Sequence, residues 1–173
     1  NFKEQTYKNK HLIILNQSKN KLIKNDEKEN ILEMYIDNTD KTLGELRNIS
    51  LQFVPPNAIW TTWDDDDWRH PIYISRMINE MRKRNTDFLM FTNRLEYNLN
   101  NQFAFRMSLQ SGLMTFFSKY NQNIQYEHKS TSEDVKVKSY AINELKTHIY
   151  DNDAKMYIRL IHDNNTSVFV EPD

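Results

Sequence analysis

The 173-residue chain contains no cysteine and only two glycines, Gly44 and Gly112. The lack of cysteine excludes a disulfide framework and a thiolate metal site, and it leaves the redox compartment undecided. Because glycine is scarce, we expect asparagine to take most of the left-handed turn positions. These absences limit the chemistry of the chain without indicating a function.

The chain also lacks a long apolar run and a net charge of either sign. No run approaches the roughly 18 residues of a membrane span, and no signal peptide is visible. The 23 basic residues nearly cancel the 24 acidic ones, so no overall field favours a nucleic-acid or membrane partner. We therefore expect a soluble chain, in the cytoplasm rather than secreted, whose important electrostatics are local.

The length of the chain is that of one domain with a real core, and no internal repeat or low-complexity linker divides it. We treat residues 1–173 as a single domain. Because the sequence starts at Asn1 rather than Met, inside what resembles the end of a helix, we expect further sequence upstream. The oligomeric state is left open.

Short apolar runs separated by polar stretches are typical of strands buried in a parallel sheet. We predict such strands at residues 11–15, 31–36, 58–63, 88–91 and 155–162. A helix is predicted from Pro71 onward, because its apolar residues recur at i, i+3, i+4 and i+7. A looser pattern predicts a helix from Thr42 to the proline pair at 55–56. Residues 103–108 and 114–117 are predicted to be short antiparallel strands around residues 110–112.

The most unusual stretch is Trp-Thr-Thr-Trp-Asp-Asp-Asp-Asp-Trp at residues 60–68. Four consecutive carboxylates repel one another unless a cation lies among them, and a divalent ion with oxygen ligands is the natural partner. The cluster follows a predicted strand, and open α/β sheets bind ligands at the carboxyl ends of their strands. A calcium loop is excluded, because the sixth position is not glycine and the twelfth is Ser75 rather than glutamate. A solvated acidic turn, in which one aspartate caps the following helix, remains an alternative.

Two later stretches also allow a structural or a chemical interpretation. Thr131 or Ser132 can cap a helix that carries Glu133 and Asp134 in its first turn, where the helix dipole favours negative charge. That would explain both acids without any catalytic role. His162 follows a predicted strand, and a histidine in that place is either a loop residue or a ligand.

Taken together, these pieces resemble the family 2 glycosyltransferases of the GT-A fold. Residues 5–15 are similar to the end of that family's first helix and its second strand. The other matching elements are Gly44, Arg47 and Asn48 with the Gly…Arg-Asn element, residues 64–67 with the Asp-x-Asp-Asp motif, residues 133–134 with the Glu-Asp motif, and residues 156–167 with the late strand and its His-containing loop. The resemblance implies a nucleotide-sugar-binding α/β/α sandwich of GT-A type with a mixed, mainly parallel central sheet.

Two positions depart from the pattern of that family. Its first strand, with a Pro-x-Tyr-Asn type motif, is absent, which agrees with an amino-terminal truncation. Where the family usually has acidic residues after its second strand, this chain has Asn16 and Gln17. The identity of the donor nucleotide is therefore open, with a UDP-sugar as the expectation.

The resemblance implies transfer of a sugar from a nucleotide-diphosphate sugar to a hydroxyl of a glycan, protein or lipid acceptor, with inversion. The residues that it assigns are Asp66 and His162 to the metal, Asp64 to the metal or the ribose, Arg47, Asn48 and Asp65 to the nucleotide sugar, Asp134 to the general base, and Glu133 to its orientation. The metal would be Mn²⁺ or Mg²⁺, and a histidine ligand favours Mn²⁺.

Two other functions stay open at this point. The chain can be a catalytically inactive GT-A-like domain that serves in binding or interaction. It can also be another divalent-metal phosphoryl-transfer enzyme, such as a nuclease, although such enzymes need a second, distant pair of carboxylates. The aromatic residues Tyr97, Phe103 and Phe105 either stack on an acceptor sugar or pack inside the sheet.

Overall fold

The computed structural model describes residues 1–18, 20–23, 30–37, 40–109, 112, 115–151, 153–163 and 165. Its elements in chain order are β1 (Leu12–Asn16), β2 (Ile31–Tyr35), α1 (Leu43–Leu51), β3 (Ile59–Trp60), β4 (Trp68–Arg69), α2 (Tyr73–Arg84), β5 (Phe88–Phe91), β6 (Asn93–Asn98), β7 (Phe103–Ser108), β8 (Phe116–Lys119), α3 (Val135–Glu144), β9 (Thr147–Tyr150), the 3₁₀ helix η2 (Ala154–Met156) and β10 (Tyr157–Ile161). The described residues contain both helices and strands, as expected for the α/β class.

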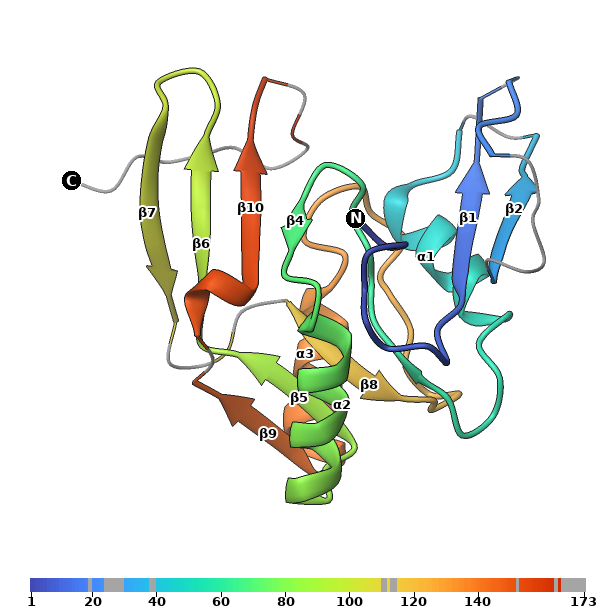
Figure 1. The fold of residues 1–173 in the computed structure, drawn as a ribbon. Coiled ribbons are helices and arrows are strands. Elements are labelled where there is room, and N and C mark those ends of the chain that lie inside the picture. The colour runs from blue at the N-terminus through green and yellow to red at the C-terminus, as the bar shows by residue number, and fades with distance from the viewer. Residues whose placement is uncertain are drawn as a thin grey trace.

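The strands of the described residues form three sheets. In Figure 1 the sheet with β6, β7 and β10 is at upper left, the sheet with β5, β8 and β9 is at lower centre, and β1 and β2 are at right. Their strand orders are β1-β2, β4-β10-β6-β7 and β3-β8-β5-β9. Three of the strand pairings are parallel and four are antiparallel. The strand arrangement is therefore mixed, as expected, but it is divided among three hydrogen-bonded sheets.

Most of the predicted apolar strands are found close to their expected positions, as β1, β2, β5 and β10. The strand expected at residues 58–63 is limited to β3, because the chain leaves the sheet at Thr61, whose hydroxyl donates to the carbonyl of Phe116 at 2.6 Å. Residues 103–108 do form a strand, but β7 pairs with β6, while β8 pairs with β3 and β5. Met114, at the start of the other predicted strand, lies outside the described residues.

The two predicted helices are present, and their ends have identifiable causes. Thr42 and Glu45 form a capping box at the start of α1, in which each side chain accepts from the backbone N–H of the other residue. Helix α2 begins after Ile72 and has no side-chain cap, so the alternative of a capping aspartate from the acidic run is wrong. It ends at Arg84, and its C-cap residue Asn85 has a φ of 49°. Three of the five non-glycine residues with positive φ in the described chain are asparagines, as expected.

Helix α3 does not use the predicted cap. The helix begins at Val135, and its N-cap residue is Asp134, whose side chain makes no capping hydrogen bond. Ser132 instead takes a left-handed conformation with a φ of 57°, and Glu133 precedes the helix. The prediction that Thr131 or Ser132 caps a helix with two acids in its first turn is therefore wrong.

Strand β5 separates two apolar clusters, which lie on opposite faces of its sheet. Leu89 and Phe91 pack in the cluster that contains the buried face of α2, while Phe88 and Met90 pack in the cluster that contains α3. This alternation follows from the pleat of the strand. Figure 1 shows the two helices on either side of this sheet, which gives the local α/β/α layering. No helix among the described residues has the length and apolar character of a membrane span.

Helix α1 approaches the segment at residues 127–133 closely through Gly44. The Gly44 N–H donates to the carbonyl of Lys129 at 3.0 Å. A Cβ atom at this position would lie 1.7 Å from the carbonyl oxygen of Glu127 and 3.2 Å from the Cβ of Glu133. Only glycine allows this contact, because the nearest obstacle is backbone that cannot rotate away.

We predict that Gly44→Ala lowers the free energy of unfolding by about 1–3 kcal/mol, as overpacking typically does, even though alanine has the higher helix propensity. Urea unfolding followed by circular dichroism measures the change. Ser50→Ala, near the other end of α1, is the control and should change stability by less than about 0.5 kcal/mol. A Gly44→Ala protein as stable as the wild type would contradict the close contact.

Candidate functional site

The four consecutive aspartates lie in the loop between β3 and β4, which Figure 1 shows between β10 and α1. Their environments differ from one residue to the next. Asp64 and Asp65 are exposed, Asp66 is half-buried and Asp67 is buried. Asp65 forms no hydrogen bond or ion pair with the described part of the chain. The four consecutive aspartates therefore differ in solvent exposure and in hydrogen-bond partners, so they can play different chemical roles.

Asp66 and His162, the residues predicted to bind the metal, lie next to each other. The Asp66 Oδ2 atom is 3.1 Å from the His162 Nε2 atom, although 96 positions separate the two residues in sequence. Asn165 completes this group, because its Nδ2 atom lies 3.3 Å from Asp66 Oδ2 and its Oδ1 atom accepts from the His162 N–H at 2.8 Å. A carboxylate and an imidazole thus meet at the carboxyl end of β10.

This pair of donors fits a hard or borderline divalent cation that shares its other ligands with water and a substrate. Mg²⁺ and similar ions are commonly held through one or two carboxylates plus substrate phosphates, and imidazole suits transition metals. The described residues contain no group of three or more His, Asp or Glu side chains that could hold a metal by themselves. The geometry therefore fits an open site and does not fit a closed structural one.

Arg47 connects three segments of the site. Its guanidinium forms an ion pair with the buried Glu133 and lies 3.5 Å from the Asp64 carboxylate. The same group lies over the ring of Tyr126, 5.4 Å from its centroid. Gly44, Arg47 and Asn48 are spaced at i, i+3 and i+4, so one face of α1 presents all three to the segment at residues 126–133.

Asn48 is engaged with the backbone of Tyr126 in both directions. Its Nδ2 donates to the Tyr126 carbonyl at 2.9 Å, and its Oδ1 accepts from the Tyr126 N–H at 2.8 Å. These bonds hold the segment that carries the ring beneath Arg47. The role of Asn48 in this structure is thus to support Arg47, and its part in nucleotide binding stays a prediction.

Asp134 lies beside the Arg47 and Asp64 charges and is half-buried. Burial raises the pKa of the Asp134 carboxyl, while the positive charge of Arg47 opposes that rise. Its neighbour Glu133 points to Arg47 instead. The two acids of the predicted Glu-Asp motif therefore have separate surroundings, one in an ion pair and one with a raised pKa.

Three residues in this region were not predicted from the sequence: Tyr126, Arg69 and Tyr157. Arg69 is a buried cation next to the acidic run, and Tyr157 donates a hydrogen bond to Asp67. The sequence carried a signal for both, since Arg69 lies two residues after the acidic cluster and Tyr157 belongs to the late-strand motif. Tyr126 carried none, because its position depends on the distant Asn48.

The aromatic residues considered for acceptor stacking lie on the sheet that contains β10. Phe103 and Phe105 project from the same face of β7, and their rings stack with centroids 6.0 Å apart. Phe103 is 53% exposed, so it does not pack inside the sheet. Tyr97, on β6, is half-buried.

The chain is similar in fold to S. aureus TarS. With TarS 1-349 in complex with UDP-GlcNAc, the TM-score is 0.74 at 11% sequence identity, over 98% of this chain and 56% of that one. With TarS 1-349 in complex with UDP, the TM-score is 0.72 at 11% identity, over 92% of this chain and 54% of that one. This likeness confirms the GT-A-type α/β fold expected from the sequence.

The chain spans about half the length of the TarS 1-349 chains that it matches. A longer TarS structure gives a TM-score of 0.68 at 12% identity, and this chain covers 33% of it. No protein-family model matches the sequence, and no curated protein matches it either. The comparison with TarS therefore concerns the fold.

We predict that Arg47→Ala lowers the free energy of unfolding by about 3–5 kcal/mol, because the buried Glu133 carboxylate loses its partner. Urea unfolding measures this loss. The double variant Arg47→Ala/Glu133→Gln should recover part of it, since the uncompensated charge is then removed.

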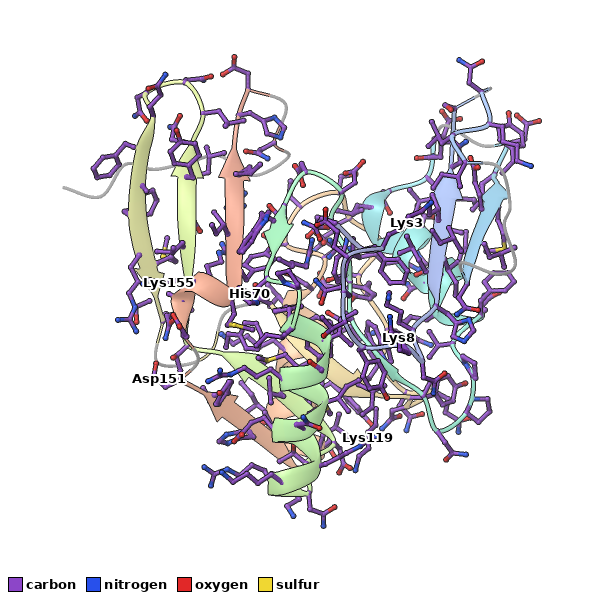
Figure 2. The ribbon with its side chains drawn as sticks, viewed as in Figure 1. Lys3, Lys8, His70, Lys119, Asp151 and Lys155 are labelled. Carbon is purple, nitrogen blue, oxygen red and sulfur yellow. The ribbon has the colours of Figure 1, made fainter. Side chains whose placement is uncertain are left out.

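Arg106→Ala is the matched control for this prediction, because Arg106 pairs at 3.7 Å with the exposed Asp151, labelled in Figure 2. An exposed pair contributes about 1 kcal/mol or less. Equal losses for Arg47→Ala and Arg106→Ala would show that the Arg47 pair is not a buried one.

Proposed function

We propose that this chain is the nucleotide-sugar-binding and catalytic part of a metal-dependent glycosyltransferase. It takes a nucleotide-diphosphate sugar, with a UDP-sugar as the best candidate, and transfers the sugar to an acceptor hydroxyl with inversion. The proposal gains support from the fold, since the similar TarS structures hold UDP and UDP-GlcNAc. It also places the chain among the family 2 glycosyltransferases, which the sequence resembles.

One observation carries the proposal: Asp66 and His162 meet at 3.1 Å, next to a loop whose Asp64 pairs with Arg47. Two side chains that can ligate a metal thus meet at the carboxyl end of β10, and the loop that carries Asp66 also contacts a fixed cation through Asp64. GT-A-like folds need such groups to hold a diphosphate. A solvated acidic turn does not require its third aspartate to contact a histidine 96 residues away, as Asp66 does here.

The residues divide the chemistry between two sides of the sugar. Asp66 and His162 would hold a divalent cation, and that ion would supply positive charge to neutralise the departing diphosphate. Arg47 supplies a fixed positive charge for the nucleotide sugar, and Asp64 and Asp65 face that donor. Asp134 accepts the proton of the acceptor hydroxyl as that oxygen bonds to the anomeric carbon and the bond to the diphosphate breaks. Attack from the opposite face gives inversion.

The burial of Asp134 supports its role as the base. A general base works best when its pKa lies near the working pH, and burial moves the pKa of Asp134 in that direction. Glu133 contributes indirectly, because its ion pair orients Arg47 beside Asp134. Asp134 occupies the N-cap position of α3, but its side chain makes no capping hydrogen bond to the first turn that would lower its pKa.

The alternative, a catalytically inactive GT-A-like binding domain, is favoured by one observation at Asn16. Its Nδ2 donates to Glu33 at 2.5 Å, and its Oδ1 accepts from the Ser18 N–H at 2.7 Å. Asn16 stands where the family usually has an acidic residue, and its side chain is already hydrogen-bonded to other residues of the chain. Turnover separates the two functions, since the inactive domain binds a nucleotide sugar but does not cleave it.

We predict that the protein binds UDP only with Mn²⁺ or Mg²⁺ present, and that Asp66→Ala abolishes this binding. Isothermal titration calorimetry with and without the metal measures both effects. Asp87→Asn is the control, because Asp87 pairs with Lys119 on the surface and should leave binding unchanged. Binding of UDP that ignores the metal would exclude the metal-dependent mechanism.

We predict that Asp134→Asn retains UDP binding and loses about 10²-fold to 10⁴-fold of its rate, since proton abstraction supplies a factor of this size. Hydrolysis across a panel of nucleotide sugars measures the rate and also identifies the donor. A retained rate would assign the base to another residue.

The pH profile gives a further readout of the same assignment. Activity should fall as the pH decreases through the pKa of Asp134, because a protonated carboxyl accepts no proton, and this fall should lie above the ordinary value of 3.8. Lys138 lowers this pKa by its charge, so Lys138→Met should move the fall to higher pH. Lys155→Met, at the distant η2 (Figure 2), should leave the profile unchanged.

A further inference from the structure

Asp67 is the one aspartate of the acidic run whose two carboxylate oxygens are both occupied by another strand. Its Oδ1 accepts from the Leu160 backbone N–H at 3.1 Å, and its Oδ2 accepts from the hydroxyl of Tyr157. Both donors belong to β10, and the residue is only 7% exposed. A cation could reach this carboxylate only after these bonds were broken.

Arg69 holds the same loop from the other side. Its guanidinium lies 4.3 Å from the ring of Trp63 and 5.0 Å from that of Tyr157. One nitrogen donates to the backbone carbonyl of Asp64 at 2.8 Å, and another lies 3.9 Å from Asp67 Oδ2. One buried cation therefore fixes the start of the acidic run and also compensates the charge at its end.

These contacts set how the loop is aligned along β10. Strand β4 pairs with β10 in the register Arg69 with Tyr157 and Trp68 with Ile158. The Asp67 side chain continues this pairing, because it accepts from Leu160 where the backbone ladder of β4 has ended. Asp66 precedes Asp67 by one residue and His162 follows Leu160 by two, so the alignment brings Asp66 to His162.

We propose that Asp67, with Tyr157 and Arg69, forms a positioning clamp that places Asp66 against His162, and that Asp67 itself does not bind the metal. The inference rests on the proposed function, since the pair that is positioned is the proposed metal pair. It also separates the roles of two neighbouring aspartates, since Asp66 faces the cation and Asp67 faces the protein.

The test compares Mn²⁺ binding in the presence of UDP, measured by electron paramagnetic resonance of the free ion, for the full chain and its variants. Tyr157→Phe removes one hydroxyl and leaves every carboxylate in place. We expect it to raise the Kd for Mn²⁺ by about 10-fold to 100-fold, as the loss of a residue that orients a ligand typically does. Tyr140→Phe is the matched control, because the half-buried Tyr140 makes no hydrogen bond with the described residues, and its Kd should equal that of the wild type.

A metal ligand and a positioning residue at position 67 predict different rankings of the variants by their Mn²⁺ affinity. If Asp67 positions, Asp67→Asn weakens binding to an extent similar to Tyr157→Phe, while Asp66→Ala abolishes it. Asparagine can still accept from Leu160 and donate to the Tyr157 oxygen, so this variant is expected to fold. If Tyr157→Phe binds like the wild type and Asp67→Asn loses binding as completely as Asp66→Ala, Asp67 is a ligand and the proposal is overturned.

A readout without metal separates this inference from the proposed function. Hydrogen exchange of the Leu160 amide, followed by NMR, should be faster in Asp67→Ala and unchanged in Asp87→Asn. Unchanged exchange in Asp67→Ala would overturn the clamp while leaving the proposed function in place. A wild type that binds no Mn²⁺ with UDP would overturn the proposed function, and the positioning of a metal pair with it, whatever the exchange rates are.

Discussion

The hydrogen bonds between the Asp67 carboxylate and strand β10 fix the relation between the two halves of the site. They join a loop that carries four acids to a strand that ends in a histidine, and they do so inside the protein, where water does not compete. Burial raises the pKa of the Asp67 carboxyl, and the Tyr157 hydroxyl and the Arg69 charge counter that rise. An isolated carboxylate in this place would be costly, so the bonds and the buried arginine are required together.

Two arginines organise the charges around this contact, and each connects segments that are distant in sequence. Arg47 joins α1 to Glu133 and to Asp64, while Arg69 joins β4 to the backbone of Asp64 and to Asp67. Asp64 is therefore held between two cations, one at its side chain and one at its carbonyl. A site with such fixed charges needs little reorganisation when charge develops in a reaction, which is the main source of electrostatic catalysis.

The sequence predicted the elements whose pattern is local. The helix that starts near Thr42, the buried face of α2 and the apolar strand β5 all follow from residue spacing within a few turns. It also predicted that Asp66 and His162 meet, although only through resemblance to a family, because no local pattern relates residues so far apart. It missed β6, because the polar composition of that strand lacks the apolar pattern expected of a buried one. Its polar side chains Asn93, Glu96 and Asn98 are instead buried with hydrogen-bond or ion-pair partners. The α3 cap failed because Ser132 turns left-handed and Glu133 binds a distant arginine, which is a tertiary preference that outweighs a local one.

The contacts that build the site all span long stretches of chain: 86 residues between Arg47 and Glu133, 93 between Asp67 and Leu160, and 96 between Asp66 and His162. Closing loops of this length costs chain entropy before any contact is gained, so such contacts tend to form late in folding. On a ribosome, the acidic loop would emerge long before the strand that aligns it. The nascent protein therefore carries an unmatched cluster of negative charge until β10 has been made, and only then can Asp66 meet His162.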